Sequence, residues 1–78
     1  MHKVRDTEIL KAFGANLKRI RLEKGKTQEE LAEDAGISQV SIARIEAGKL
    51  NSSICTVQRI IVALDIDSNV LFAFDSMH

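Results

Sequence analysis

The 78-residue sequence contains no proline, tryptophan or tyrosine, and only three phenylalanines. Without proline to interrupt helices, and with many Ala, Leu, Glu, Lys and Arg residues, the composition favours an all-helical chain with little or no strand. Long apolar runs are also missing, since none exceeds residues 60–64, far short of the ~18 residues that cross a bilayer. Residues 1–5 lack the apolar stretch of a signal peptide. We therefore expect a cytoplasmic protein without a membrane partner.

Cysteine is nearly absent, because Cys55 is the single one, and this excludes an internal disulfide. The two histidines, His2 and His78, lie at opposite ends of the chain, and neither stands at metal-ligand spacing from Cys55. The acidic residues within 29–34 are typical of a solvated helix face rather than of paired catalytic carboxylates. So short a chain also has little interior for a substrate pocket. The sequence predicts neither an enzyme nor a metal or cofactor site.

Net charge is zero, because eleven Lys and Arg residues balance eleven Asp and Glu residues. The balance is uneven along the chain: residues 1–26 hold eight of the basic residues and three of the acidic ones, and residues 27–78 reverse that excess. A neutral molecule of this kind can still present one basic face. The pattern permits a nucleic-acid partner but does not predict one, since a solvated basic helix has the same composition.

The first two helices follow from apolar spacing and capping residues. Apolar residues recur at steps of three and four over residues 8–24, after a capping position at Asp6 or Thr7, and predict the first helix. Thr27 and Glu30 are spaced as a capping box, in which each side chain bonds the other residue's backbone N–H. They predict that the second helix begins there.

A third helix is expected after a tight turn. Gly36 can adopt the left-handed conformation that ends the second helix, and Ser38 can cap the next, over residues 39–47. The isoleucines of this segment supply its buried side, which leaves an outer face of short polar side chains with almost no acid. Small residues such as Ala43 allow a helix to approach another surface closely. The third helix is therefore the strongest candidate for a binding element.

The C-terminal part predicts a fourth helix, capped by Ser52 or Ser53, and a short last element. The expected core stripe of the fourth helix consists of Ile54, Val57, Ile61 and Leu64. A second apolar stripe, about 100° away by the helical period, comprises Cys55 and Val62, beside Ile66. A small domain has little use for a second stripe unless something covers it. Residues 69–74 fit one or two helical turns and an edge strand equally, because short apolar runs are ambiguous.

Two helices joined by a short glycine-containing turn, the second with a polar outer face, form a helix-turn-helix arrangement. The run FGANLKRIRLEKGKTQEELAEDAGISQVSIARIEAGK, residues 13–49, resembles the Cro/XRE-type, phage-repressor-like helix-turn-helix family, and the likeness continues through VQRIIVALDI to about residue 66. Within that family the chain is similar to the restriction-modification controller proteins. The resemblance implies an all-α, five-helix DNA-binding domain over residues 1–78, with a core at about 7–74 and the motif at helices 2 and 3.

The resemblance implies a transcriptional regulator that binds double-stranded DNA. It would act as a homodimer on a palindromic operator, with the third helix in the major groove. An antitoxin-like or other protein-interaction module is the alternative, because a fold does not dictate its partner. A toxin or restriction gene next to the coding sequence would separate these hypotheses.

Site residues follow from the same resemblance and from side-chain chemistry. Base edges would be read by Gln39, Val40, Ser41 and Arg44. The Gln39 amide suits adenine, Val40 suits a thymine methyl group, and Arg44 suits guanine or a phosphate, whereas Ser41 could instead bond only the backbone. Phosphate contacts are expected from Lys26, Gln28 and Lys49.

Two further roles are expected away from DNA. The dimer interface would consist of Cys55, Val62, Ile66, Phe72 and Phe74. Arg21 and Glu46 resemble the family's buried ion pair between the first and third helices, which specifies geometry more than it adds stability. We therefore leave that pair out of the binding site.

Overall fold

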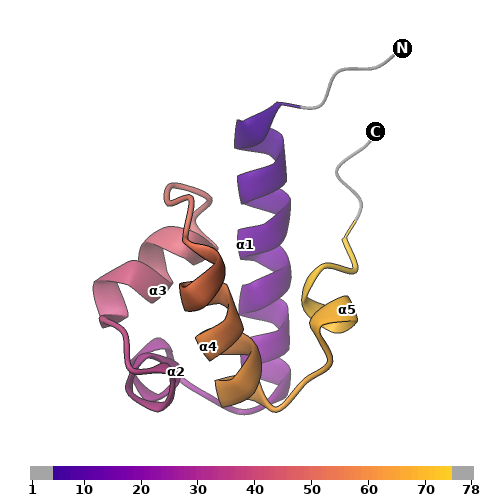
Figure 1. Ribbon diagram of the computed structural model, residues 1–78. Coiled ribbons are helices and arrows are strands. Elements are labelled where there is room, and N and C mark those ends of the chain that lie inside the picture. The colour runs from indigo at the N-terminus through magenta and orange to yellow at the C-terminus, as the bar shows by residue number, and fades with distance from the viewer. Residues whose placement is uncertain (1–4, 75–78) are drawn as a thin grey trace.

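The computed structural model describes residues 5–74 of the chain (Figure 1). The helices in this range are α1 (Asp6–Glu23), α2 (Gln28–Ala35), α3 (Gln39–Glu46), α4 (Ile54–Leu64) and α5 (Ser68–Leu71). Residues 5–74 contain no strand, so the prediction of an all-α, five-helix fold is confirmed. The ambiguous C-terminal element is a helical turn and not an edge strand. His2 and His78 lie outside the described residues.

The long helix α1 runs the length of the molecule, with α2, α3 and α4 on one side of it and α5 on the other (Figure 1). One hydrophobic cluster lies between them, and every helix contributes to it. The largest fully buried side chains are those of Leu17, Ile20, Leu31, Ile42, Ile45, Ile60, Leu64 and Leu71. Because burial of each stabilises the fold by roughly 1.5–3 kcal/mol, this cluster is what holds the short helices in place.

The helix-turn-helix segment forms for the local reasons that its sequence indicates. Thr27 Oγ1 accepts a hydrogen bond from the backbone N–H of Glu30 at 3.0 Å, and the Glu30 carboxylate accepts one from the Thr27 N–H at 2.8 Å. Gly36 ends α2 with φ 70° and ψ 34°, a left-handed conformation that glycine adopts without a Cβ clash. Ser38 Oγ then accepts from the N–H of Ser41 and caps α3. The predicted boundaries of α2 and the predicted start of α3 are thus confirmed, and α3 ends at Glu46, one residue before the expected end.

The start of α1 differs from the prediction. The N-cap residue is Arg5, which makes no side-chain capping hydrogen bond, so neither Asp6 nor Thr7 caps this helix. Both lie inside its first turn, where Asp6 and Glu8 place negative charge near the positive end of the helix dipole. Charge rather than a side-chain cap therefore favours this helix end.

The core stripe of α4 also differs from the prediction. Ile54 is 88% exposed and does not belong to the core, whereas Ile60, which was not assigned to the stripe, is fully buried. Ile54 is the first residue of α4, and helical side chains tilt toward the N-terminus, so its side chain projects past the end of the core. The stripe that packs inward is instead Val57, Ile60, Ile61 and Leu64.

Gly14 allows α1 to pack directly on the end of α3. A Cβ at this position would clash with the carbonyl oxygen of Ile45 and would lie 2.7 Å from that of Glu46. Any other residue would have to push α3 away from α1. The position of α3 therefore depends on a glycine in the middle of a different helix, and sequence reasoning did not single it out.

Helix α5 is a single turn, too short to be stable alone, and a buried asparagine holds it against α1. Asn16 Nδ2 donates to the carbonyl oxygens of Val70 at 3.0 Å and Leu71 at 2.6 Å. The other side of the Asn16 amide accepts two hydrogen bonds from the Arg19 guanidinium, at 3.2 and 2.6 Å, which fixes its orientation. Asn16 thus adds hydrogen bonds to carbonyl groups at the end of α5, of which that of Val70 also accepts from the Ala73 backbone N–H.

Candidate nucleic-acid interface

The outer face of α3 presents three of the four residues expected to read bases. Gln39, Val40 and Arg44 are exposed, and Val40 retains 66% of its accessible surface. The opposite face is fixed in the core, because Ile42 and Ile45 are at most 1% exposed. A short helix anchored on one side and polar on the other has the dimensions that the major groove admits.

Ser41 is engaged in the cap of its own helix. Its side chain is half-buried, and its Oγ accepts a hydrogen bond from Ser38 Oγ at 2.9 Å. Ser38 Oγ in turn accepts from the Ser41 N–H at 3.1 Å. Of the four residues, Ser41 has the least freedom to contact another molecule.

A buried ion pair joins α1 to α3 on the inner side of α3. Arg21 donates from Nε to Glu46 Oε2 at 2.6 Å and from Nη2 to Glu46 Oε1 at 3.1 Å, and the two side chains are only 7% and 3% exposed. The pairing expected from the family resemblance is therefore present. Its two parallel hydrogen bonds define one orientation of α3 relative to α1, as bidentate arginine pairs do.

The same carboxylate holds Gln28 at the N-terminus of α2. Gln28 Nε2 donates to Glu46 Oε1 at 3.0 Å, which leaves the second amide hydrogen and the side-chain oxygen for other partners. Gln28 and Gln39 line one shallow hollow of about 510 Å³ between the start of α2 and the start of α3. The first N–H groups of α2 have no partner within the helix and carry its positive dipole end, a combination that suits an anion such as a phosphate.

The two lysines expected at phosphates lie in different environments. Lys49 is exposed in the loop after α3, and no hydrogen bond or ion pair joins its side chain to residues 5–74. Lys26 also lines the hollow, but its Nζ donates to Asp34 Oδ2 at 2.6 Å and to the carbonyl oxygen of Ala63 at 2.9 Å. The structure thus leaves Lys49 available and occupies Lys26 internally.

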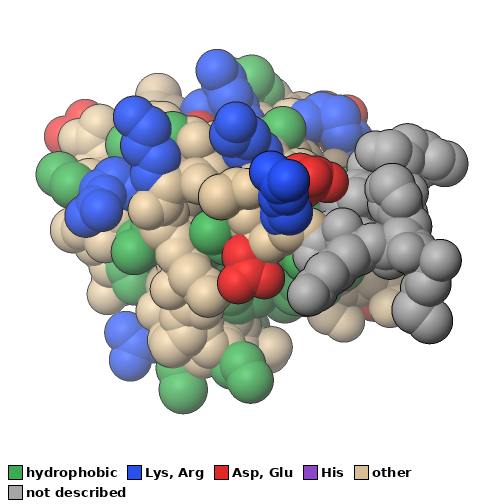
Figure 2. Space-filling model, turned by 90° about the horizontal axis from the view of Figure 1, so that it is seen from above, with side chains coloured by type: hydrophobic (Ala, Val, Ile, Leu, Met, Phe, Trp, Pro, Cys, Tyr) green, Lys and Arg blue, Asp and Glu red, His purple; other side chains and the backbone are tan. Residues whose placement is uncertain are grey.

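Seen from above, most of the visible Lys and Arg side chains lie across one half of the molecule (Figure 2). Hydrophobic side chains protrude at the opposite edge of the same view (Figure 2). One of the basic residues is fixed next to the loop after α3, since the backbone of Lys11 packs against Gly48 so closely that a Cβ there would lie 2.8 Å from the Lys11 Cα. Most basic side chains on this face are therefore gathered on one half of it, although the chain has zero net charge.

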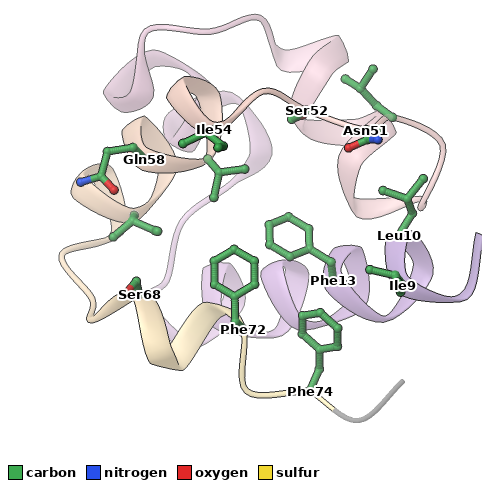
Figure 3. Close-up of a pocket in the computed structure, with 13 residues that line it drawn as sticks. Ile9, Leu10, Phe13, Asn51, Ser52, Ile54, Gln58, Ser68, Phe72 and Phe74 are labelled. Carbon is green, nitrogen blue, oxygen red and sulfur yellow. The ribbon is translucent and has the colours of Figure 1, made fainter. Parts of the chain in front are cut away.

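An apolar groove of about 400 Å³ runs between α1, α4 and α5 (Figure 3). Phe13 and Phe72 point into it, with their ring centroids 5.4 Å apart, and Ile54 lies across from them (Figure 3). The ring centroids of Phe74 and Phe13 lie 6.1 Å apart, in an edge-to-face arrangement. Phe72 and Ile54 are 53% and 88% exposed, so the groove is an open surface rather than part of the core.

The residues expected at a dimer interface divide between the groove and the neighbouring face of α4. Phe72 and Phe74 line the groove, while Cys55 and Val62 are exposed beside it on α4, with Val62 at 68%. Ile66 is half-buried and packs on the core. Sequence reasoning missed Ile54 and Ile9, which also line the groove. The signal for Ile54 was its place directly after the capping Ser53.

The pKa of Glu30 is lowered, first by the hydrogen bond from the Thr27 backbone N–H and then by the Thr27 side chain. Within residues 5–74 no three His, Cys, Asp or Glu side chains gather as a metal site. No helix in that range is long and apolar enough to span a bilayer.

A glycine-ended α2, a short turn and a serine-capped α3 with a polar outer face define a protein of the helix-turn-helix class. The sequence matches the family described as "Helix-turn-helix" over residues 17–71. The chain therefore belongs to the Cro/XRE-type helix-turn-helix family of transcriptional regulators, as its resemblance implied. An uncharacterised HTH-type transcriptional regulator of Sinorhizobium fredii is 36% identical over 59 residues, 76% of this chain and 77% of that protein.

Solved structures of similar proteins include restriction-modification controllers. The controller protein C.AhdI from Aeromonas hydrophila has a TM-score of 0.79 and 35% identity, over 81% of this chain and 96% of that one. Wild-type C.Esp1396I, another such controller, has a TM-score of 0.76 and 34% identity, over 82% of this chain and 84% of that one. A Vibrio cholerae transcriptional regulator of the family has a TM-score of 0.83 and 25% identity, and 88% of this chain matches 39% of that one. These relatives are regulators rather than enzymes.

Proposed function

We propose that this protein is a sequence-specific, double-stranded DNA-binding regulator that acts as a homodimer on a palindromic operator. The observation that carries the proposal is the outer face of α3, which is exposed, free of acid in its first turn and rigidly supported by the Arg21–Glu46 pair. A rigid support matters because base edges are read by hydrogen bonds whose geometry tolerates little movement. We also propose that the protein acts in the cytoplasm, where DNA is accessible.

Base reading falls mainly to three side chains of α3. The Gln39 amide can bond adenine N6 and N7 together, and Arg44 can bond guanine O6 and N7 or a phosphate. Val40 offers an exposed apolar surface to a thymine methyl group. Ser41 contributes less, because its hydroxyl already accepts from Ser38.

Phosphate contacts fix the register of α3 in the groove. Gln28, held by Glu46 at the N-terminus of α2, presents its second amide hydrogen next to the free backbone N–H groups. Lys49, at the other end of α3, can contact the DNA phosphates, because no hydrogen bond or ion pair joins its exposed side chain to residues 5–74. Such contacts contribute affinity that falls with salt but carry no sequence information.

The homodimer would form through α4 and α5. Cys55, Val62 and the aromatic groove form neighbouring apolar surfaces whose exposure in a monomer is unfavourable. A two-fold axis through α4 would bring the same surface of a second copy against them and place two α3 helices about one DNA turn apart, ~34 Å. A palindromic operator is the DNA counterpart of that symmetry.

The groove also supports the alternative function. An apolar groove between helices, lined by Phe72 and Ile54, can accept a helix of another protein, as in an antitoxin. In that case α4 and α5 would bind a partner chain, and dimerisation would not be required.

A selection from a random duplex pool, followed by salt titration, tests the proposed function. We expect a palindrome with half-sites about one helical turn apart, bound with an affinity that falls steeply with salt. A folded sample that enriches no duplex would contradict it and favour the protein-interaction alternative. Sedimentation of the same sample reports whether a dimer forms without DNA.

A further inference from the structure

One lysine in the loop between α1 and α2 connects α2 to α4 through its ammonium group. Lys26 Nζ donates to Asp34 Oδ2 on α2 at 2.6 Å and to the carbonyl oxygen of Ala63 on α4 at 2.9 Å. The Lys26 side chain is only 27% exposed, although a lysine in a loop is ordinarily solvated. Lys26 and Ala63 are 37 residues apart in sequence, so this contact is tertiary and not a local turn.

The C-terminus of α4 has a backbone carbonyl group that accepts a hydrogen bond from the Lys26 ammonium. Asp65, at φ 53°, ends the helix, and the N–H groups of Asp65 and Ile66 return to the carbonyl oxygens of Val62 and Ile61. Ala63 O receives its hydrogen bond from Lys26 instead. A cation at this end also interacts favourably with the negative end of the helix dipole.

The backbone of Lys26 extends the connection to α3. Its carbonyl oxygen accepts a hydrogen bond from Arg21 Nη1 at 2.7 Å, and the same guanidinium holds Glu46 at the end of α3. Lys26 therefore stands between the buried pair that orients α3 and the helix that carries Val62. A change in the Lys26 contacts would alter how α4 sits against the helix-turn-helix unit.

We infer that Lys26 is a positioning residue that sets the half-site spacing the protein selects, and not a phosphate contact. The inference rests on the proposed homodimer. If two copies join through α4, the angle between α4 and the α2–α3 unit determines the separation of the two α3 helices, and that separation is matched to the operator spacing. Lys26 adds to the core packing in setting this angle, because its ammonium group bonds α2 and α4 together.

Lys26→Met tests the inference, with Lys24→Met as the matched control. Methionine keeps an unbranched stem of similar length and removes the charge and its hydrogen bonds. Lys24 is exposed at the end of α1, and its side chain makes no hydrogen bond or ion pair with residues 5–74, so its variant makes the same change in net charge. Each variant is measured on a half-site, on the selected palindrome and on palindromes lengthened or shortened by one base pair, at several salt concentrations.

We expect Lys26→Met to bind the half-site as the control does, with the same salt slope. Its preference for the selected spacing over the shifted ones should fall about three- to fivefold, the scale of a partly exposed ion pair together with a helix-end charge. Asp34→Asn, at a position that is 48% exposed, removes only the charge that Lys26 meets on α2 and should lower the spacing preference in the same direction by less. If Lys26→Met fails to fold, the Asp34→Asn variant still tests the inference.

Two results would overturn the inference. A salt slope reduced by about one, with an unchanged spacing preference, would make Lys26 a phosphate contact. A spacing preference that stays at the control value in both Lys26→Met and Asp34→Asn would show that these bonds do not position α4. A wild-type protein that enriches no palindrome would instead refute the proposed dimeric function, and the spacing role would fall with it.

Discussion

The outer faces of α3 and α4 each carry a valine of nearly equal exposure in contrasting surroundings. Val40, 66% exposed, stands between polar neighbours on a face with no acid in its first turn. Val62, 68% exposed, shares its face with Cys55 beside an aromatic groove. Exposure alone therefore assigns no role, and the neighbours of an exposed apolar residue decide what it would contact.

The two faces also differ in how they are supported. Below α3, a bidentate ion pair and a glycine contact fix the helix against α1. The α5 side of the apolar surface depends on Asn16 and one buried leucine, Leu71. A rigid polar face suits the reading of base edges, whereas the α5 side of the apolar surface has fewer contacts to hold it.

Gly14→Ala should have the largest effect, because it removes the support that distinguishes α3. The added methyl group would clash with the Ile45 and Glu46 carbonyls, and we expect a loss of about 3 kcal/mol in the free energy of unfolding, despite the better helix propensity of alanine. Chemical denaturation measures this loss. Ala15→Gly, at an exposed neighbour, should cost only about 1 kcal/mol. Equal losses for the two variants would show that α3 can shift without penalty.

Val40→Asp and Val62→Asp form a matched pair that tests the comparison directly. Val62→Asp should raise the dimer dissociation constant at least tenfold, because a charge would have to be desolvated in the interface, and should leave half-site binding unchanged. Val40→Asp should weaken DNA binding by about 2 kcal/mol, through repulsion from phosphates, and leave the dimer intact. Sedimentation and half-site titration separate the outcomes. If both variants alter the same property, the two faces do not have separate roles.

Gln39→Ala and Lys49→Ala sharpen the comparison within the DNA face. Gln39→Ala should cost about 1–3 kcal/mol on the selected operator and relax the preference at one base pair. Lys49→Ala should weaken all sequences alike and reduce the salt slope by about one. Titrations on the operator and on scrambled duplexes measure both effects. A uniform loss for Gln39→Ala would remove it from the base readers.

Local chemistry explains which parts of this structure the sequence could predict. Thr27, Gly36 and Ser38 act within three residues of the helix ends that they define, so α2 and α3 could be placed from the sequence with no knowledge of the fold. The Arg21–Glu46 pair is separated by 25 residues and came from the family resemblance rather than from any local pattern.

The parts that could not be predicted depend on contacts between distant segments. Gly14 is required only because the α3 carbonyls lie against it, and the bond from Lys26 to Ala63 forms only because the end of α4 lies beside α2. Ile54 fits the helical stripe by spacing, but the helix begins at that residue and leaves its side chain beyond the core. Periodicity gives the direction of a side chain around a helix, and not whether another helix is there to meet it.

The smallest expected effect concerns Glu30, which supports the start of α2 and so the position of Gln28. Its pKa is lowered in the folded protein, chiefly by the hydrogen bond from the Thr27 backbone N–H, relative to the ordinary value of 4.5. A lowered folded pKa means that the stabilisation is fully present above the unfolded pKa and is lost as the pH falls through the folded value. Glu30→Gln should therefore lower the stability slightly at pH 7, where the charge contributes in full, and should reduce the decline in stability as the pH falls below 4.5. Thermal unfolding as a function of pH measures this, with exposed Glu29→Gln as the control from the same helical turn. If both variants show the same pH profile, the capping box does not couple the Glu30 charge to the folding of the DNA-facing end of α2.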